Sequence, residues 1–97
     1  MKRASEAALA RIEPLLKGLR AHGALRERTP GHFFLGRHEV LHFHDDPAGV
    51  FADLRLSGGF VRLPATTASD QAEVLGRVEE CIDAIEAREA RRHRRGR

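Results

Sequence analysis

The chain has 97 residues, of which 41% are hydrophobic and 32% are charged, and its formal net charge is +3. This length suits one small domain, and the hydrophobic fraction is too high for a chain that is disordered throughout. A single cysteine, Cys81, excludes an internal disulfide and a multi-cysteine metal site. The sequence has neither the roughly 20 apolar residues of a membrane span nor a signal-peptide pattern, so we expect a cytoplasmic protein.

The positive charge is concentrated near the C-terminal end. Residues 88–97 contain six arginines and one glutamate, so residues 1–87 carry a small net negative charge. We expect residues 1–87 to form a single α+β domain and residues 88–97 to be a basic tail or a frayed helix end. A run of arginines can bind nucleic-acid phosphates, but this run lacks the interleaved aromatic residues that stack on bases. The pattern favours a solvated helix end over a nucleic-acid contact.

The N-terminal part has the pattern of a helix. Apolar residues recur at spacings of three and four over residues 4–22, and Ser5 can cap the first turn. Pro14 interrupts this pattern, which predicts either a kink or a second helix that starts near Glu13. Residues 24–31 are rich in charged residues and include a proline and a glycine, which is typical of an exposed connection.

From His32 onward the apolar period changes to about two, and turn-forming residues recur at short intervals. Connections of two to four residues permit only antiparallel neighbours, so the strands should form a meander in chain order. The pattern predicts four strands, at His32–Leu35, His38–His44 or Asp45, Val50–Ser57 and Phe60–Leu63.

The last part of the chain predicts a second long helix. Residues 65–70 have the composition of a helix start, and Asp70 and Glu73 are spaced as in a capping box. One apolar stripe then runs along about 20 residues, through Val74, Val78, Cys81, Ile82 and Ile85. A cysteine on such a stripe is typical of a packed, unreactive thiol.

These elements predict an α+β fold with a four-stranded antiparallel meander sheet. Each helix has one apolar stripe, so the N-terminal and C-terminal helices should pack on the same sheet face and leave the other face open. In the second strand His38, His42 and His44 alternate with Leu41 and Phe43. Because burying the two apolar side chains contributes roughly 2–3 kcal/mol each, we expect the histidines on the open face.

The turn after this strand fixes the expected pairing. In residues 46–49, Asp-Pro-Ala-Gly, the proline suits a type I turn and the glycine can adopt a positive φ. Such a turn pairs Asp45 with Val50 and therefore brings Asp53 opposite His42. It also sets His44 opposite Phe51 and Val40 opposite Arg55 on the open face. The candidate ligand-binding residues are His38, His42, His44, Asp53 and Arg55.

Three of these residues are candidate metal ligands. Two histidines at i and i+2 of a strand lie about 7 Å apart and can both turn toward one cation. His42 and His44 with Asp53 therefore form a candidate site for a divalent transition metal. The same groups also suit acid–base chemistry, the binding of a small polar ligand, or a purely structural polar ladder. The sequence identifies no catalytic nucleophile, since Ser57 beside two glycines is typical of a turn.

The open face is also a candidate interface between two copies of the chain. With Phe33, Phe51 and Val40 expected there beside polar groups, a two-fold partner can cover this face and form a homodimer. The sequence thus leaves open whether the histidines bind a small ligand or metal, or lie in a non-enzymatic interface.

The segment GRHEVLHFHDD at residues 36–46, followed by FADLRL at 51–56, resembles the small bacterial domain called luciferase-like. Members of that family carry a similar G-R-x-E-h-x-H-h-H-x-D segment and then a strand with an aspartate. The resemblance implies that Gly36, Glu39, His42, His44 and Asp53 are the characteristic positions, and it leaves the activity open. The longer segment that usually follows in the family is reduced here to a short turn.

Overall fold

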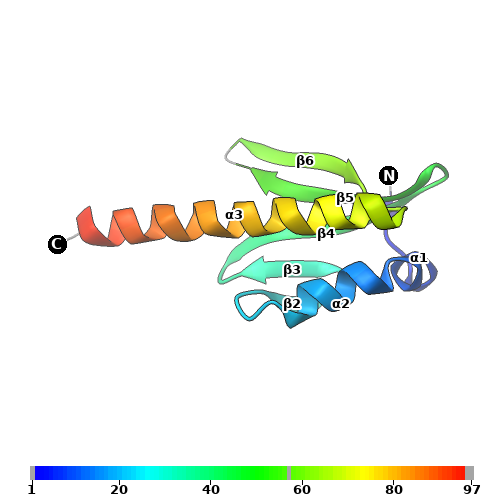
Figure 1. Cartoon of the computed structure of the whole chain (residues 1–97), viewed down its shortest axis with the longest axis horizontal. Coiled ribbons are helices and arrows are strands. Elements are labelled where there is room, and N and C mark those ends of the chain that lie inside the picture. The colour runs from blue at the N-terminus through cyan, green and yellow to red at the C-terminus, as the bar shows by residue number, and fades with distance from the viewer. Residues whose placement is uncertain (1, 57, 96–97) are drawn as a thin grey trace.

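The structure is a computed structural model that describes residues 2–56 and 58–95. Within these residues an antiparallel sheet is covered on one face by helices, which confirms the α+β class (Figure 1). The elements follow in the order β1 (Lys2–Arg3), α1 (Glu6–Arg11), α2 (Glu13–Ala21), β2 (Arg26–Thr29), β3 (His32–Leu35), β4 (His38–Asp46), β5 (Gly49–Leu56), β6 (Gly59–Pro64) and α3 (Ala68–Arg95).

Proline divides the N-terminal helical region into two helices. The second helix begins at Glu13, immediately before Pro14, as one of the two sequence alternatives predicted. Proline fits there because the first turn of a helix leaves its backbone N–H groups without partners in any case. Ser5 caps the first helix, since its Oγ accepts a hydrogen bond of 3.2 Å from the backbone N–H of Ala8.

The sheet is a meander in the order β2-β3-β4-β5-β6. The remaining strand, β1, lies outside this order and pairs with β4. The meander confirms the predicted connectivity, but the sheet contains two strands more than expected. The two-residue strand β1 lies against the end of β4, where Lys2 pairs with Asp45 and Arg3 with His44. A strand of two residues is too short to show the alternation of apolar and polar side chains from which strands are predicted.

The other additional strand, β2, occupies residues that were expected to be an exposed connection. Its residues Arg26–Thr29 show no apolar alternation, because an edge strand with charged side chains buries little surface. Backbone pairing with β3 holds it in place. A salt bridge of 2.6 Å between Arg20 Nε on α2 and Glu27 Oε1 ties the strand to the helix layer.

The pairing of β4 with β5 matches the predicted register. His42 pairs with Asp53 and His44 pairs with Phe51. The turn between the strands has the expected chemistry: Asp46 Oδ1 accepts a hydrogen bond of 2.8 Å from the backbone N–H of Ala48. The predicted strand end at Ser57 lies outside the described residues.

The pairing of β3 with β4 contains a β-bulge that the sequence analysis did not anticipate. Phe33 pairs with Leu41 whereas Phe34 pairs with Glu39, so Val40 is an extra residue in β4. Val40 and Leu41 therefore both turn toward the helices, and both are 0% exposed. The expectation that Val40 lies on the open face opposite Arg55 is wrong, because the bulge interrupts the alternation of side chains there.

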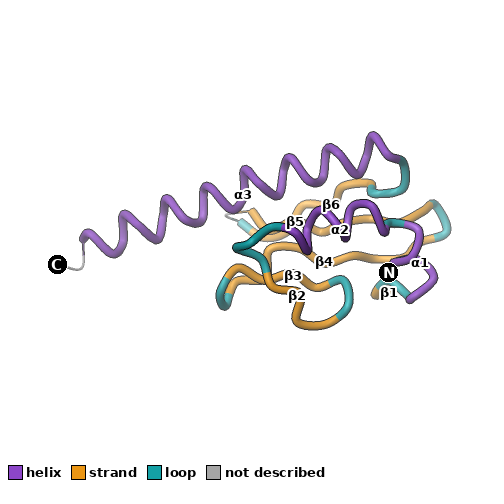
Figure 2. Tube along the Cα trace, turned by 60° about the horizontal axis from the view of Figure 1, so that its bottom comes forward, coloured by secondary structure: helices purple, strands orange, loops and turns teal. Residues whose placement is uncertain are grey.

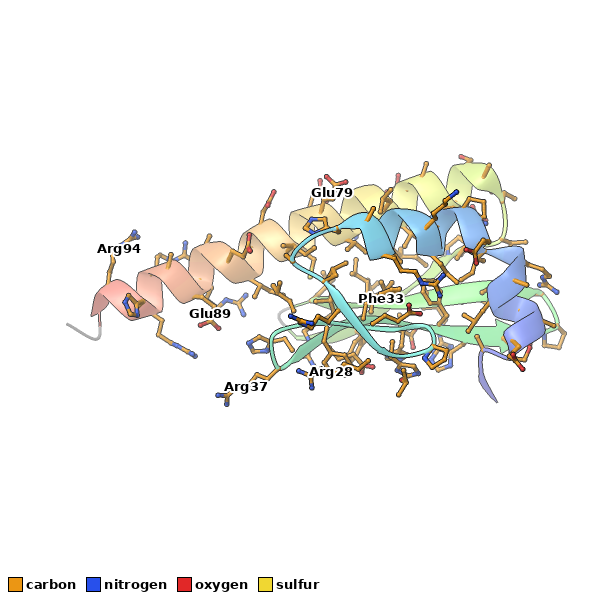
Figure 3. The ribbon with its side chains drawn as sticks, turned by 90° about the horizontal axis from the view of Figure 1, so that it is seen from below. Arg28, Phe33, Arg37, Glu79, Glu89 and Arg94 are labelled. Carbon is orange, nitrogen blue, oxygen red and sulfur yellow. The ribbon has the colours of Figure 1, made fainter. Side chains whose placement is uncertain are left out.

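The core lies between the sheet and the helices, which all cover the same face (Figures 1 and 2). Phe33 points into this core and is 0% exposed, so its expected position on the open face is also wrong (Figure 3). Cys81 is 9% exposed and belongs to the core, as expected. The largest fully buried side chains are Phe33, Phe43, Ile12, Leu16, Leu19, Leu41, Leu54, Ile82, Val40, Val50, Val74 and Val78.

Helix α3 has 28 residues, more than the predicted 20, and it extends past the end of the sheet (Figure 1). Thr67 Oγ1 accepts a hydrogen bond of 3.0 Å from Asp70 N, and Asp70 Oδ2 accepts one of 3.0 Å from Thr67 N. The capping box therefore lies three residues before the predicted Asp70–Glu73 pair.

The helix includes residues 88–95 of the expected basic tail, whereas residues 96–97 lie outside the described part. No helix in residues 2–56 and 58–95 is long and apolar enough to cross a membrane.

Candidate functional site

The uncovered face of the sheet carries a cluster of imidazoles and carboxylates from three neighbouring strands. Strand β3 contributes one residue, β4 three and β5 one. We call them the open-face cluster: His32, Glu39, His42, His44 and Asp53.

The three predicted metal-ligand residues come together in this cluster. Nε2 of His44 lies 2.7 Å from Oδ2 of Asp53, and Nε2 of His42 lies 3.4 Å from the same oxygen. The two imidazole rings meet edge to face, with their centroids 5.0 Å apart. One ligand atom from each of the three residues lies within 4.8 Å of the other two. The cross-strand pairing of β4 and β5 is what brings the carboxylate between the two imidazoles.

An arginine that the sequence analysis missed holds this carboxylate from the other side. Arg62 on β6 pairs with Asp53 in the sheet register, and its Nε and Nη2 donate hydrogen bonds of 2.8 and 3.0 Å to the two carboxylate oxygens. These hydrogen bonds, together with the nearby His44, lower the pKa of Asp53 although partial burial opposes them. The side chain is therefore ionised at neutral pH.

The other side of the cluster is built around Glu39. Because of the bulge, Glu39 lies on the open face, where its Oε2 is 2.8 Å from Nδ1 of His32 and its Oε1 is 3.4 Å from Nδ1 of His42. The rings of His32 and His42 are stacked, with centroids 5.6 Å apart and planes at 14°. Residue spacing did not reveal either His32 or Glu39, and only the family resemblance included Glu39.

The bulge also moves His38 away from the cluster. Its Nε2 lies 3.4 Å from Oε1 of Glu89 on α3, so the side chain points to the helix side of the sheet. The expectation that His38 shares a face with His42 and His44 is wrong, since alternation does not continue through an extra residue. Arg55 lies at the margin of the cluster, where its Nε donates a hydrogen bond of 2.6 Å to the backbone oxygen of Glu39.

His42 is the central imidazole of the cluster, between the rings of His32 and His44. Burial lowers its pKa, and the charges of Glu39 and Asp53 oppose this effect without overcoming it. The ring of Phe60 on β6 lies against it, with the centroids 5.0 Å apart. Within the described residues, the buried Nδ1 of His42 and Nε2 of His32 have no hydrogen-bond partner. At neutral pH, His42 is therefore a neutral imidazole with a lone pair available on one nitrogen.

The cluster contains two overlapping sets of residues that could hold a cation, and His42 belongs to both. One set adds His44 and Asp53, and the other adds His32 and Glu39. Cys81 takes no part in either, since its Sγ donates to the backbone oxygen of Arg55 from the helix side and burial raises its pKa. The chemistry available on the open face is therefore that of imidazole and carboxylate groups.

Comparison with known proteins gave no match: no family model fits the chain, and no similar protein was found among curated proteins or solved structures. The resemblance to the luciferase-like domain therefore stays a prediction from the sequence.

Proposed function

We propose that this chain binds a divalent transition metal through His42, His44 and Asp53. The observation that carries the proposal is the convergence of two Nε2 atoms on one carboxylate oxygen, at 3.4 and 2.7 Å. Ligand atoms of a tetrahedral site with bonds of about 2.0–2.2 Å are separated by roughly 3.3–3.6 Å. The first distance already suits such a site, and the second has to open by less than about 1 Å.

The surroundings of His42 support a role as a ligand. Metal binding through Nε2 requires a neutral ring with its proton on Nδ1, and burial favours the neutral form. Glu39 Oε1, 3.4 Å from Nδ1, is the acceptor that would orient this proton. With a metal bound at Nε2, the proton on Nδ1 of His42 would favour a hydrogen bond from Nδ1 to the Glu39 carboxylate.

The composition of the site predicts which ions bind. Imidazole ligands favour Zn²⁺, Ni²⁺ and Cu²⁺, whereas Mg²⁺ and Ca²⁺ prefer sites made of oxygen ligands. Arg62 keeps Asp53 ionised, but its guanidinium also occupies both oxygens and repels an incoming cation. We therefore expect binding of modest affinity, with Zn²⁺ and Ni²⁺ stronger than Mg²⁺.

Calorimetric titration with Zn²⁺ tests the proposal. We expect one equivalent to bind to the wild type, and His42→Ala and His44→Ala to lose this binding. His38→Ala is the matched control, since it removes a histidine from the same strand but on the other face. Because a ligand at 100 times its dissociation constant stabilises the folded state by about 2.7 kcal/mol, thermal unfolding gives an independent measurement. Equal losses in all three variants, or no binding by the wild type, would rule the proposal out.

A second candidate function is the formation of a homodimer through the open face. The observation that favours it is Phe60, which is 44% exposed and lies against His42 on this face. Light scattering gives the mass of the wild type, and Phe60→Ser should convert a dimer to a monomer. Leu56→Ser is the control, because Leu56 is the other exposed large apolar residue of the described chain, at 46%. A monomeric wild type excludes this candidate.

A further inference from the structure

The helix side of the molecule has hollows that the proposed metal site does not use. They lie where α3 runs past the sheet, beside the turn between β3 and β4, and their volumes are about 560 and 430 Å³. In Figure 3, Glu89 lies on the side of the overhanging helix that faces the end of the sheet, and Arg37 marks the neighbouring turn. His38, excluded from the open-face cluster by the bulge, lines both hollows.

The smaller hollow is lined partly by apolar and partly by charged side chains. Leu56, Cys81, Ala84 and Ile85 contribute to it from β5 and α3. Leu56 is 46% exposed although it is a large apolar residue at the end of a strand. An apolar surface that is concave and left uncovered is characteristic of sites that bind apolar groups.

Two arginines of α3 also line this hollow, and they differ in their partners. Nη2 of Arg92 lies 3.3 Å from Oε2 of Glu89. The other carboxylate oxygen of Glu89, Oε1, lies 3.4 Å from Nε2 of His38. Arg88 has no ion-pair partner in the part of the chain that the structure describes. Burial raises the pKa of the Cys81 thiol, and the positive charges of Arg55 and Arg88 oppose that rise. The Arg88 charge is therefore close enough to Cys81 to influence a group on the apolar part of the lining.

We propose that this hollow binds a small amphipathic anion, a carboxylate carried on an aliphatic chain. The chain would lie against Leu56 and Ile85, and the carboxylate would pair with Arg88. A volume of about 430 Å³ accommodates a chain of roughly ten carbons at about 30 Å³ for each heavy atom. The site lies on the opposite side of the sheet from the open-face cluster, so it does not depend on metal binding.

Titration of the ¹⁵N-labelled full chain with decanoate, followed by NMR, tests this proposal. We expect saturable shifts of the amide signals of Leu56, Cys81 and Ile85. Arg88→Ala should weaken binding about tenfold, as expected for the loss of one charge-assisted hydrogen bond. Arg94→Ala is the matched control, because Arg94 belongs to the same helix end but lines neither hollow (Figure 3). This variant should bind decanoate as the wild type does.

Two further probes separate this site from general attraction to an apolar or basic surface. Decyltrimethylammonium, which has the same chain and the opposite charge, should bind at least tenfold more weakly than decanoate. Leu56→Asp should abolish binding while keeping a dispersed NMR spectrum, because Leu56 is exposed. The proposal fails if decanoate gives no saturable shifts, if both amphiphiles bind equally, or if Arg94→Ala weakens binding as much as Arg88→Ala. It also fails if Leu56→Asp converts a wild-type dimer to a monomer, since the hollow then belongs to an interface between two copies.

Discussion

On the helix-covered face of the sheet, Phe33, Leu41 and Phe43 are at most 1% exposed and pack against apolar helix residues. On the open face, neighbouring positions of the same strands carry histidines and carboxylates, among them His42 and Glu39, that contact one another. The covered face gains its stability from apolar burial, whereas the imidazoles and carboxylates of the open face pair with one another. One strand thus supplies residues to both the core and the candidate site, and a single bulge decides which side chains belong to each.

Substitution of Val40 tests whether β4 contains the bulge, and it should cause the greatest loss of stability. Val40 is 0% exposed, so Val40→Asp would bury a carboxylate in the core and cost more than about 4 kcal/mol of unfolding free energy. In a straight strand the same side chain would lie on the open face and tolerate the change. Leu56→Asp, at an exposed apolar position, should cost less than about 1 kcal/mol. Urea denaturation measures both, and comparable losses would contradict the bulge.

The next effect compares adjacent positions of β4. Phe43→Ala should lower the unfolding free energy by about 3–5 kcal/mol, because it leaves a cavity beneath the helices. His44→Ala, one residue later on the open face, should cost only about 1 kcal/mol through its lost hydrogen bond to Asp53. Equal losses in urea denaturation would mean that the open face contributes to stability as a core does.

Arg62 distinguishes a metal site from a structural ion-pair network. If Asp53 is a ligand, Arg62→Ala frees both carboxylate oxygens from a competing cation and should raise the affinity for Zn²⁺ about threefold to tenfold. Calorimetric titration of the variant beside the wild type measures this change. A lower affinity would indicate that the guanidinium is needed to hold the carboxylate in place.

A small pH dependence of the unfolding free energy should originate at His42. Burial holds its pKa below the ordinary value of 6.5, so below that pH the unfolded chain takes up a proton more readily than the folded chain. The neutral His42 ring makes its full contribution to the unfolding free energy above about pH 6.5, and this contribution is lost as the pH falls. The metal-free wild type should therefore lose more stability between pH 7 and 5 than His42→Gln does. Identical pH profiles in urea denaturation would show that His42 does not carry this effect.

Part of the site could be predicted because it depends on local turn chemistry and strand alternation. The turn at residues 46–49 fixes the pairing of β4 with β5, and the convergence of His42 and Asp53 follows from that register. Arg62 could not be found in this way, because its position opposite Asp53 depends on the register of β6. That register pairs Leu56 with Gly59, whereas the predicted strand ends at Ser57 and Phe60 implied a pairing of those two residues.

The bulge is the other feature that periodicity alone did not reveal. Strict alternation cannot bury both Val40 and Leu41, so two consecutive apolar residues in a strand were the available signal. Missing it assigned His38 to the wrong face and left Glu39 out of the residue-based prediction. Strand β2 escaped detection for a different reason, since an edge strand needs few apolar residues.

The most direct test of the proposed metal site is to follow the imidazole nitrogens themselves. Long-range ¹H–¹⁵N NMR spectra recorded during addition of Zn²⁺ report on each histidine ring separately. We expect the Nε2 signals of His42 and His44 to shift together and to saturate at one equivalent, while those of His38 stay unchanged. Shifts at His38 of similar size, or no change at His42 and His44 with excess Zn²⁺, would contradict it.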